Sequence, residues 1–376
     1  MQGYDYLVVG SGIAGASIAC ELAARARVLI VEREESPGYH TTGRSAAMFV
    51  ESYGNAWIRR LTGASRDFFD APPAGFCDHA LLTRRGCLTI AGQDQLAALE
   101  SLTARVESTG SEIRDLNGAA ARAMVPILRP DRVARAAFEP NSCDIDTHGL
   151  HTGYLRLARA RGASLCLDAG VDRIERRSDR WRLSLAGGEA VEARVIVNAA
   201  GAWADQIAGL AGAAPLGLEP RRRTVLLLAP PPAGVPIHHW PSVIDVDEQF
   251  YFKPESGWLL ATPADETPSL PMDAGPEELD IALCIDRIQT ATDLSVSHIQ
   301  RAWAGLRTFA PDRTPVFGYD PELAGFFWFA GQGGYGLQTA PAAARLGAAL
   351  ALGQPIPADL SDRGLIAEPF SPSRWR

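Results

Sequence analysis

A glycine-rich run near the start of the chain has the residue types and the spacing of a phosphate-binding turn. It reads Gly10-Ser11-Gly12-Ile13-Ala14-Gly15. Its three glycines permit a tight turn, close approach of the backbone to a pyrophosphate, and close packing of a helix on a strand. The first turn of that helix favours anionic phosphates through its free N–H groups and its dipole. Glu32, 17 positions after Gly15, can accept hydrogen bonds from ribose hydroxyls and disfavours the 2′-phosphate of NADP.

The flanking segments predict the elements that position this run. We expect a strand at Tyr4–Val9, a helix at Gly15–Ala24 and a second strand at Val28–Val31. That order is a βαβ unit, which indicates a parallel sheet. The alternative, a tight turn that binds no nucleotide, is weakened because strand, glycines, helix, strand and acid follow in the required order.

The residues after Glu32 distinguish a flavin from a nicotinamide nucleotide. Pro37–Ala47 is rich in small and hydroxyl-bearing residues. Such a segment lets the backbone approach an isoalloxazine ring closely and offers hydrogen-bond donors to it. A nicotinamide domain would instead continue into regular strands and helices. We therefore expect FAD.

The overall composition narrows the class of protein. Of the 376 residues, 47% are hydrophobic and 21% are charged, which is typical of a globular protein with a large core. A net charge of −8 argues against a nucleic-acid partner, because phosphate binding needs a basic face. The six cysteines are scattered, so neither a disulfide framework nor a metal site is expected. Without an apolar stretch of about 20 residues or a signal peptide, we expect a cytoplasmic protein with no transmembrane segment.

Further along the chain, nucleotide-type elements alternate with a different kind of sheet. Buried strands are expected at Val195–Val197 and Phe326–Ala330, each leading into a glycine-containing turn, and a helix at Ala340–Leu352. Thr224–Leu228 and Gln249–Phe252 look like antiparallel strands. We predict an α/β (α+β) fold, in which a Rossmann-like FAD-binding domain carries an inserted, mostly antiparallel substrate-binding domain. The FAD-binding domain is assigned to 1–85, 145–215 and 315–376, and the substrate-binding domain to 86–144 and 216–314.

Five segments together make the chain resemble the D-amino-acid oxidase/dehydrogenase family of flavoproteins, which includes glycine oxidase and sarcosine oxidase. They are Gly10–Gly15, Gly38–Ala47, Asn198–Asp205, Ala304–Pro315 and Gly331–Thr339. They follow the family's order along nearly the whole chain, and the likeness is greatest to the bacterial D-arginine dehydrogenase type.

The resemblance implies a set of FAD contacts. They are Gly10, Gly12, Ile13, Ala14, Gly15, Glu32, Arg33, Thr41, Thr42, Gly43, Arg44, Ser45, Ala46, Ala47, Met48, Val171, Ala200, Gly201, Trp203, Gln332, Gly333, Gly334, Tyr335, Gly336, Gln338 and Thr339. Some relatives attach the flavin through a cysteine near the segment Ala304–Pro315, which has none here, and others through a histidine near the position of His40. We predict non-covalent FAD.

An amino acid substrate needs a clamp for its carboxylate, and the planar fork of arginine binds carboxylates bidentately. Arg307 lies beside the last flavin segment, and the run Arg221–Arg223 enters a strand. Side chains alternate on a strand, so Arg222 points opposite to its two neighbours. The resemblance selects Arg222 as the inward residue; a solvated basic turn is the alternative.

The resemblance also places Tyr53 and Tyr251 in the substrate pocket, where their hydroxyls can reach the carboxylate or the amine. For Tyr251, a buried strand aromatic is the competing explanation. Gln338 and the Gly334 carbonyl are expected near the amine, and Tyr335 in the pocket or the core. Two positions depart from the arginine-type relative, namely Cys87 in place of an acid and Met48 in place of a histidine. Both make the pocket more apolar, so a cationic side chain would lose its partner.

These features predict an enzyme that oxidises the Cα–N bond of D-amino acids, preferring neutral or hydrophobic side chains over basic ones. The hydride leaves Cα for flavin N5, and the imino acid is hydrolysed to a 2-oxo acid and ammonia. One alternative is an oxidase of secondary amines such as sarcosine or proline-like acids. From another class, the chain could be a flavin-binding subunit without catalysis. The electron acceptor, oxygen or a quinone, is left open.

Overall fold

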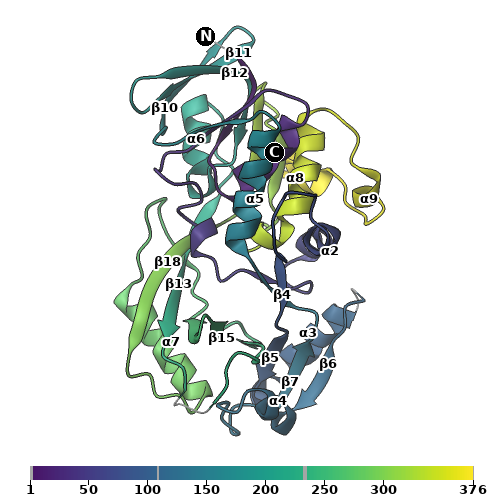
Figure 1. Cartoon of the computed structure of the whole chain (residues 1–376), viewed down its shortest axis with the longest axis vertical. Coiled ribbons are helices and arrows are strands. Elements are labelled where there is room, and N and C mark those ends of the chain that lie inside the picture. Colours follow the sequence, from purple (N-terminus) through teal and green to yellow (C-terminus); the bar gives the residue numbers. More distant parts are fainter. Residues whose placement is uncertain (1–2, 108–109, 232–234, 376) are drawn as a thin grey trace.

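A computed structural model describes residues 3–107, 110–231 and 235–375. The chain forms two lobes, one above the other in Figure 1, and the first and last segments of the sequence lie together in the upper lobe. Each lobe is built on its own sheet. The chain passes between the lobes several times, as the prediction of an inserted domain requires.

The first sheet, in the upper lobe, contains eight strands within the described ranges. Their order is β10-β11-β12-β1-β2-β9, with β20 beside β12 and β19 beside β20. Strands β9, β2, β1, β12 and β20 are parallel to their neighbours in this run, and β10, β11 and β19 are antiparallel additions. The bounds are β1 Tyr4–Val9, β2 Val28–Val31, β9 Ser164–Cys166, β10 Val171–Arg177, β11 Arg180–Leu185, β12 Ala190–Asn198, β19 Val316–Tyr319 and β20 Phe326–Ala330.

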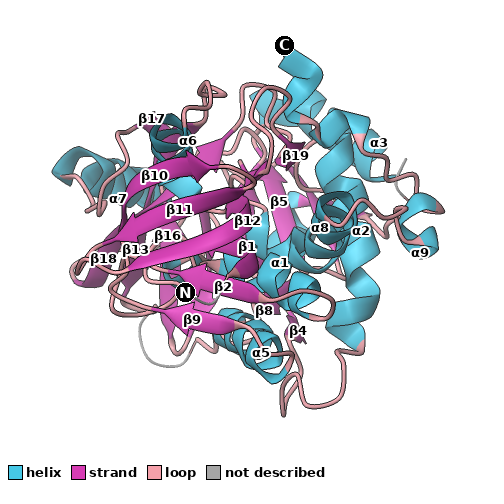
Figure 2. Cartoon of the chain, turned by 90° about the horizontal axis from the view of Figure 1, so that it is seen from above, coloured by secondary structure: helices cyan, strands magenta, loops and turns pink. Residues whose placement is uncertain are grey.

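Helices cover both faces of this sheet, which explains why its central strands are apolar throughout. On one face, Val8 and Phe329 pack with residues of α1 (Ile13–Ala23) and α8 (Gly336–Ala351). On the other face, Leu7 and Trp328 pack with residues of α6 (Ala204–Ala211). Helix α5 (Thr147–Ala160) lies against α1, and α2 (Ala56–Asp70) against α8. Figure 2 shows α1, α2 and α8 on the same side of the strands.

The second sheet, in the lower lobe, has nine described strands and is antiparallel except where β14 pairs with β5. Its order is β17-β13-β16-β15-β14-β5-β7-β6, and the long strand β18 pairs with β13. Helices α3 (Leu96–Glu107), α4 (Gly118–Met124) and α7 (Glu278–Ala291) belong to this lobe. The bounds are β5 Cys87–Ala91, β6 Arg114–Asn117, β7 Arg135–Glu139, β13 Glu219–Leu228, β14 Ser242–Asp245, β15 Tyr251–Glu255, β16 Trp258–Thr262, β17 Thr267–Pro268 and β18 Ile299–Phe309.

A small third sheet links the lobes. In it, β8 (Cys143–Ile145) pairs with β3 (Met48–Phe49) and with β4 (Leu82–Arg84). Lys253, the only lysine of the chain, is buried and reaches from β15 to Asp144 on β8, with which it forms an ion pair of 2.8 Å. This contact ties the third sheet to the second.

The predicted fold class is confirmed, and most differences concern where elements begin. Helix α1 starts at Ile13 rather than Gly15, because Gly12 is its extended N-cap residue. Helix α8 starts at Gly336 rather than Ala340, directly after the turn that the glycines form. The strands of the first two sheets lie within the segments assigned to each domain, but the domain boundaries themselves stay a prediction. No helix among the described residues is both long enough and apolar enough to cross a membrane.

Candidate active site

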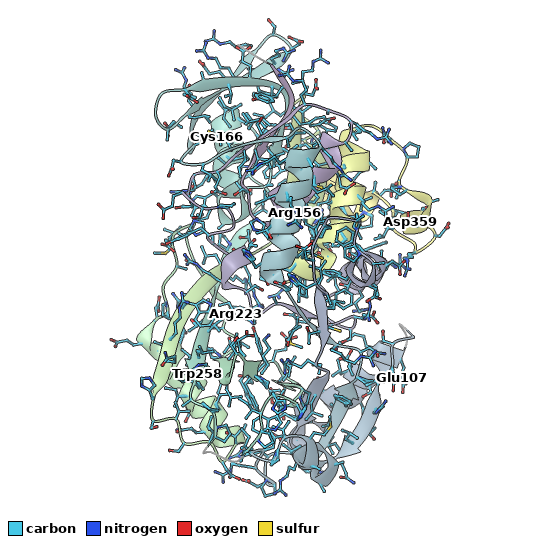
Figure 3. All side chains as sticks on the ribbon, viewed as in Figure 1. Glu107, Arg156, Cys166, Arg223, Trp258 and Asp359 are labelled. Carbon is cyan, nitrogen blue, oxygen red and sulfur yellow. The ribbon has the colours of Figure 1, made fainter. Side chains whose placement is uncertain are left out.

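A cavity of about 510 Å³ is lined by residues of both larger sheets and of the loops that follow their strands. Its upper end is lined by the glycine-rich turn, by Glu32 and by Trp203. Its lower end is lined by Arg223, Tyr251 and Arg307, which lie on strands of the second sheet. Figure 3 places Arg223 at the waist between the lobes. Both lobes therefore contribute to one continuous binding space.

The glycine-rich turn leaves no room for side chains at two of its positions. Gly10 has a φ of +99°, and a Cβ there would lie 2.6 Å from the Ala199 carbonyl oxygen. A Cβ at Gly15 would lie 1.8 Å from the carbonyl oxygen of Gly10. The turn can thus bring the N-terminus of α1 against the cavity, where its backbone N–H groups suit a pyrophosphate. The sequence requires glycine here for reasons of space as well as conformation.

Glu32 is held in place at the upper end of the cavity. One of its carboxylate oxygens accepts hydrogen bonds from the Ser11 N–H at 2.8 Å and the Ser11 hydroxyl at 2.7 Å. The other accepts from the Glu34 N–H at 3.1 Å. A carboxylate offers about four acceptor positions, so Glu32 can also accept from ribose hydroxyls.

The hydroxyl-rich segment forms one side wall of the cavity. Thr42 Oγ1 accepts a hydrogen bond from the Ile13 N–H at 3.0 Å, which fixes the wall to the start of α1. Thr41 donates to the Leu306 carbonyl at 2.6 Å, and Arg44 donates to the Ala304 carbonyl at 3.0 Å. The segment is therefore anchored to the nucleotide turn on one side and to β18 on the other.

Arg307 is the principal charged group at the lower end. Its side chain is partly buried, its Nη1 atom is fully buried without a hydrogen-bond partner among the described residues, and its Nη2 atom donates to the Tyr251 hydroxyl at 3.5 Å. Burial acts to lower the pKa of Arg307, but Tyr251, Tyr53, Tyr335 and Glu266 more than offset it, so the pKa is raised. A permanently charged fork with a buried, free donor is suited to binding a carboxylate.

The arrangement of the cavity fits FAD. Glycines admit a pyrophosphate, Glu32 suits a ribose, and the anchored wall of Thr41, Thr42 and Arg44 continues toward Arg307. A model of the FAD dependent oxidoreductase family known as DAO matches residues 5–350.

The chain belongs to this family.

This DAO-family oxidoreductase uses FAD, and individual relatives are distant in sequence. FAD-dependent oxidoreductase domain-containing protein 1 of Mus musculus is 25% identical over 91% of this chain and 80% of its own length. The crystal structure of glycine oxidase from Geobacillus kaustophilus superposes with a TM-score of 0.85 at 24% identity, over 100% of this chain and 99% of that one. L-Proline dehydrogenase from P. horikoshii gives 0.81 at 21% identity, over 100% and 98%. The nearer likeness to D-arginine dehydrogenases stays a prediction.

Most of the predicted cofactor residues of the oxidoreductase line the cavity. They are Gly10, Gly12, Ile13, Ala14, Glu32, Arg33, Thr41, Thr42, Arg44, Ser45, Ala46, Val171, Ala200, Gly201, Trp203, Gln332, Gly333, Gly334 and Gly336. His40 lines it too, with its ring nitrogen 2.9 Å from Glu34. Contact with FAD and its non-covalent attachment stay predictions.

Seven of the predicted cofactor residues do not line the cavity, and for three of them the structure gives a reason. Gly15 lies behind the turn against Gly10. Gln338 is buried and bonds the backbone of Val50 and the Thr62 hydroxyl. Thr339 donates to the Tyr335 carbonyl within α8. The other four are Gly43, Ala47, Met48 and Tyr335.

The expectation that Arg222 faces the substrate is wrong, and its neighbour Arg223 takes that orientation. Arg222 forms ion pairs with Asp280, at 2.9 Å, and with Glu277, both at or near the start of α7. In the pairing of β13 with β18, Arg223 lies opposite Gly305 and Arg221 opposite Arg307, so these positions share a face of the sheet. Neighbouring arginines do point to opposite faces of the sheet, as predicted, but it is Arg223 that faces the cavity.

Arg223 forms ion pairs with Asp265 and Glu266, whereas Arg307 forms none among the described residues. Arg223 donates to the Asp265 carbonyl at 2.8 Å and to Glu266 at 3.5 Å. Glu266 also pairs with Arg313, and although burial acts to raise its pKa, the arginines hold the pKa below its usual value. The charge of Arg307 is therefore the more available of the two for binding a substrate anion.

The two predicted pocket tyrosines come from different segments of the chain, and both interact electrostatically with Arg307. Tyr251 lines the cavity from β15. Tyr53, although predicted there, is not among the residues that line the cavity. Its ring packs on that of Tyr335 at 4.9 Å, and burial raises the pKa of Tyr53 while Arg307 lowers it. The two tyrosines thus lie on different elements around one guanidinium.

Cys87 and Met48 do not line the cavity, and a carboxylate lies next to Cys87. Cys87 on β5 is paired with Glu139 on β7, and both side chains are buried. Burial raises the pKa of Glu139 to about 7. Neither Arg223 nor Glu139 was predicted from the sequence. Arg223 could have been found only by knowing which side chains of β13 face the cavity. The residues next to Glu139 in the sequence carry no pattern that indicates a functional role.

Proposed function

We propose that this enzyme oxidises the Cα–N bond of an amino acid whose carboxylate binds Arg307. The observation that carries the proposal is the Arg307 guanidinium, whose Nη1 donor is buried and free, at the end of a cavity that begins at a nucleotide turn. Bidentate binding of a carboxylate would fix the substrate with Cα at a defined position.

The residues of the chain have separate roles in this reaction. Arg307 holds the carboxylate, and the Tyr251 and Tyr53 hydroxyls donate to the carboxylate or contact the amine. FAD, when bound, supplies the acceptor for the hydride that leaves Cα. The positive charges of Arg307 and Arg223 disfavour an ammonium group nearby, so they favour loss of its proton before oxidation. The imino acid is then hydrolysed to a 2-oxo acid and ammonia.

We propose D-amino acids with neutral or hydrophobic side chains as the preferred substrates. Among the described residues that line the cavity, the carboxylates are Glu32 and Asp172, both at the nucleotide end. At the lower end, Ala46, Val225 and Leu306 offer apolar surface beside Arg307 and Arg223. A basic side chain would meet like charge there without a partner.

A secondary amine is the second candidate substrate. L-Proline dehydrogenase shares the fold over the full length of this chain, and its named substrate is a cyclic secondary amine with a carboxylate. Arg307 would serve such a substrate equally well. A flavin-binding subunit without catalysis is less well supported, because such a subunit has no use for a guanidinium with a free donor at the end of the cavity.

Anaerobic mixing tests the proposal. The purified yellow protein is combined with D-Leu, D-Met, D-Arg, glycine, sarcosine or proline, and flavin absorbance is followed. Bleaching by D-Leu or D-Met is expected. Faster bleaching by sarcosine or proline would select the secondary-amine alternative, and no bleaching by any amino or imino acid would contradict catalysis on the Cα–N bond. Subsequent exposure to air or to a soluble quinone identifies the electron acceptor.

A further inference from the structure

The segment Val50–Tyr53 leaves the third sheet and is held by both lobes before it reaches Tyr53. From the upper lobe, Gln338 on α8 accepts from the Val50 N–H at 3.3 Å and donates to the Val50 carbonyl at 3.4 Å. From the lower lobe, Glu139 accepts a hydrogen bond from the Ser52 hydroxyl at 2.9 Å. Ser52 and Glu139 are each only 5% exposed.

The buried Glu139 carboxylate makes little contact with groups that could stabilise its charge. In the described part of the chain, its carboxylate has the single side-chain hydrogen bond from Ser52 and no ion pair. A buried carboxylate without a cationic partner carries a desolvation cost that an apolar side chain would avoid. The contact lies one residue from Tyr53, whose hydroxyl is assigned to the substrate.

We propose that Glu139 is a positioning residue that holds Tyr53 beside Arg307 through the hydroxyl of Ser52. The inference rests on the proposed function of that site. Tyr53 is only partly buried, and its ring packs against Tyr335 on one side. Gly54, the next residue, has a φ of +88°, so the chain turns sharply there. Without the Ser52 contact, the Tyr53 hydroxyl would lose its defined position.

The charged groups around Glu139 make this contact sensitive to pH. Burial raises the pKa of Glu139 to about 7, the Ser52 hydrogen bond lowers it, nearby Glu51 raises it and Arg105 lowers it. An ionised carboxylate accepts a hydrogen bond about twice as strongly as a neutral acid. Ser52, and with it Tyr53, should therefore be held more firmly above pH 7 than below it.

Steady-state kinetics between pH 5.5 and 8.5 test the proposal, using the fastest amino acid from the anaerobic screen. In the wild type, KM should fall roughly fivefold as pH rises through 7, the effect of strengthening one hydrogen bond by about 1 kcal/mol. In E139Q and S52A, KM should lose this inflection while kcat changes little. In Y53F, adding E139Q should have no further effect on KM, because the residue that Glu139 positions has lost its hydroxyl.

E21Q is the control, because Glu21 on α1 is a partly buried carboxylate whose pKa is also raised mainly by burial, but it pairs with Arg161 at 3.7 Å and not with the segment that carries Tyr53. It should keep the wild-type profile. A wild-type inflection in E139Q, or equal effects of E139Q with and without Tyr53's hydroxyl, would overturn the proposal. If no amino acid is oxidised, the Kd of benzoate, read from the flavin spectrum of the same variants, tests the positioning separately. Benzoate affinity that is identical in all variants at every pH would then refute it.

Discussion

Arg222 and Arg223 are adjacent on β13, yet their guanidinium groups lie on opposite faces of the sheet. Arg222 is bound by Asp280 and Glu277 at the start of α7, and Arg223 lines the cavity that also contains Arg307. Two cationic groups therefore surround the lower end of the cavity, and a third, identical in type, stabilises the outer face. This separation allows catalysis and stability to be tested independently on similar residues.

Replacing Arg307 by methionine should greatly weaken substrate use. Loss of one partner from a buried charged contact costs about 2–5 kcal/mol, so kcat/KM should fall by roughly 30-fold or more. Arg307→Lys keeps the charge but loses the planar fork, so it should recover only part of the loss. Anaerobic flavin reduction at several substrate concentrations measures the change.

Arg222→Met is the matched control for Arg307. It should lower the midpoint of thermal unfolding, because Asp280 loses a buried partner, and leave kcat/KM within about threefold of the wild type. An effect of Arg222→Met on kcat/KM as large as that of Arg307→Met would contradict the assignment of the two faces.

Gly15→Ala should prevent the binding of FAD. A Cβ at this position would lie 1.8 Å from the Gly10 carbonyl oxygen, so the turn cannot keep its shape. The ratio of flavin to protein absorbance in the purified variant measures the loss. Gly63→Ala on α2 is the control, since a Cβ there meets nothing within 4 Å and should stabilise the helix by up to about 1 kcal/mol. Normal flavin content in Gly15→Ala would refute the steric argument.

D-Leu and D-Met should be better substrates than D-Arg, because the lower end of the cavity carries two arginines and no carboxylate among its described lining residues. We expect at least a tenfold difference in kcat/KM, equivalent to about 1.4 kcal/mol of lost binding. A clear preference for D-Arg would mean that Glu139 or another acid serves the substrate side chain.

Glu139 should also make stability depend on pH. Its pKa is raised in the folded protein, so its favourable contribution is complete below pH 4.5 and is lost as pH rises through about 7. The shift corresponds to up to about 3 kcal/mol. Urea unfolding should show E139Q gaining stability over the wild type between pH 5 and 8. A constant difference at both pH values would show that Glu139 titrates normally.

The upper end of the cavity was predictable from sequence because its requirements are local. Gly10, Gly15 and Glu32 belong to one βαβ unit, and steric and hydrogen-bonding demands fix their spacing. These three residues lie between positions 10 and 32, so a short stretch of chain was enough to predict them. The fold class also needed the strands expected near residues 195, 225, 250 and 326.

The lower end depends on contacts between distant segments, which local patterns do not encode. The register of β13 with β18, some 80 residues later, determines which side chains of β13 face the cavity, and therefore whether Arg222 or Arg223 does so. The position of Glu139 beside Cys87 follows from the pairing of β7 with β5. Gln338, expected at the amine, is instead used by the backbone of Val50, a residue 288 positions away.

The shared cavity also links the survival of the fold to the supply of cofactor. Since both lobes line it, FAD can bind fully only when both are folded, and mass action then favours the native chain. Free cofactor at 100 times its Kd would add about 2.7 kcal/mol to the free energy of unfolding. When the chain is synthesised faster than FAD is supplied, the apoprotein should be partly unfolded for a larger fraction of the time than the FAD-bound protein. Proteases should therefore degrade the apoprotein faster.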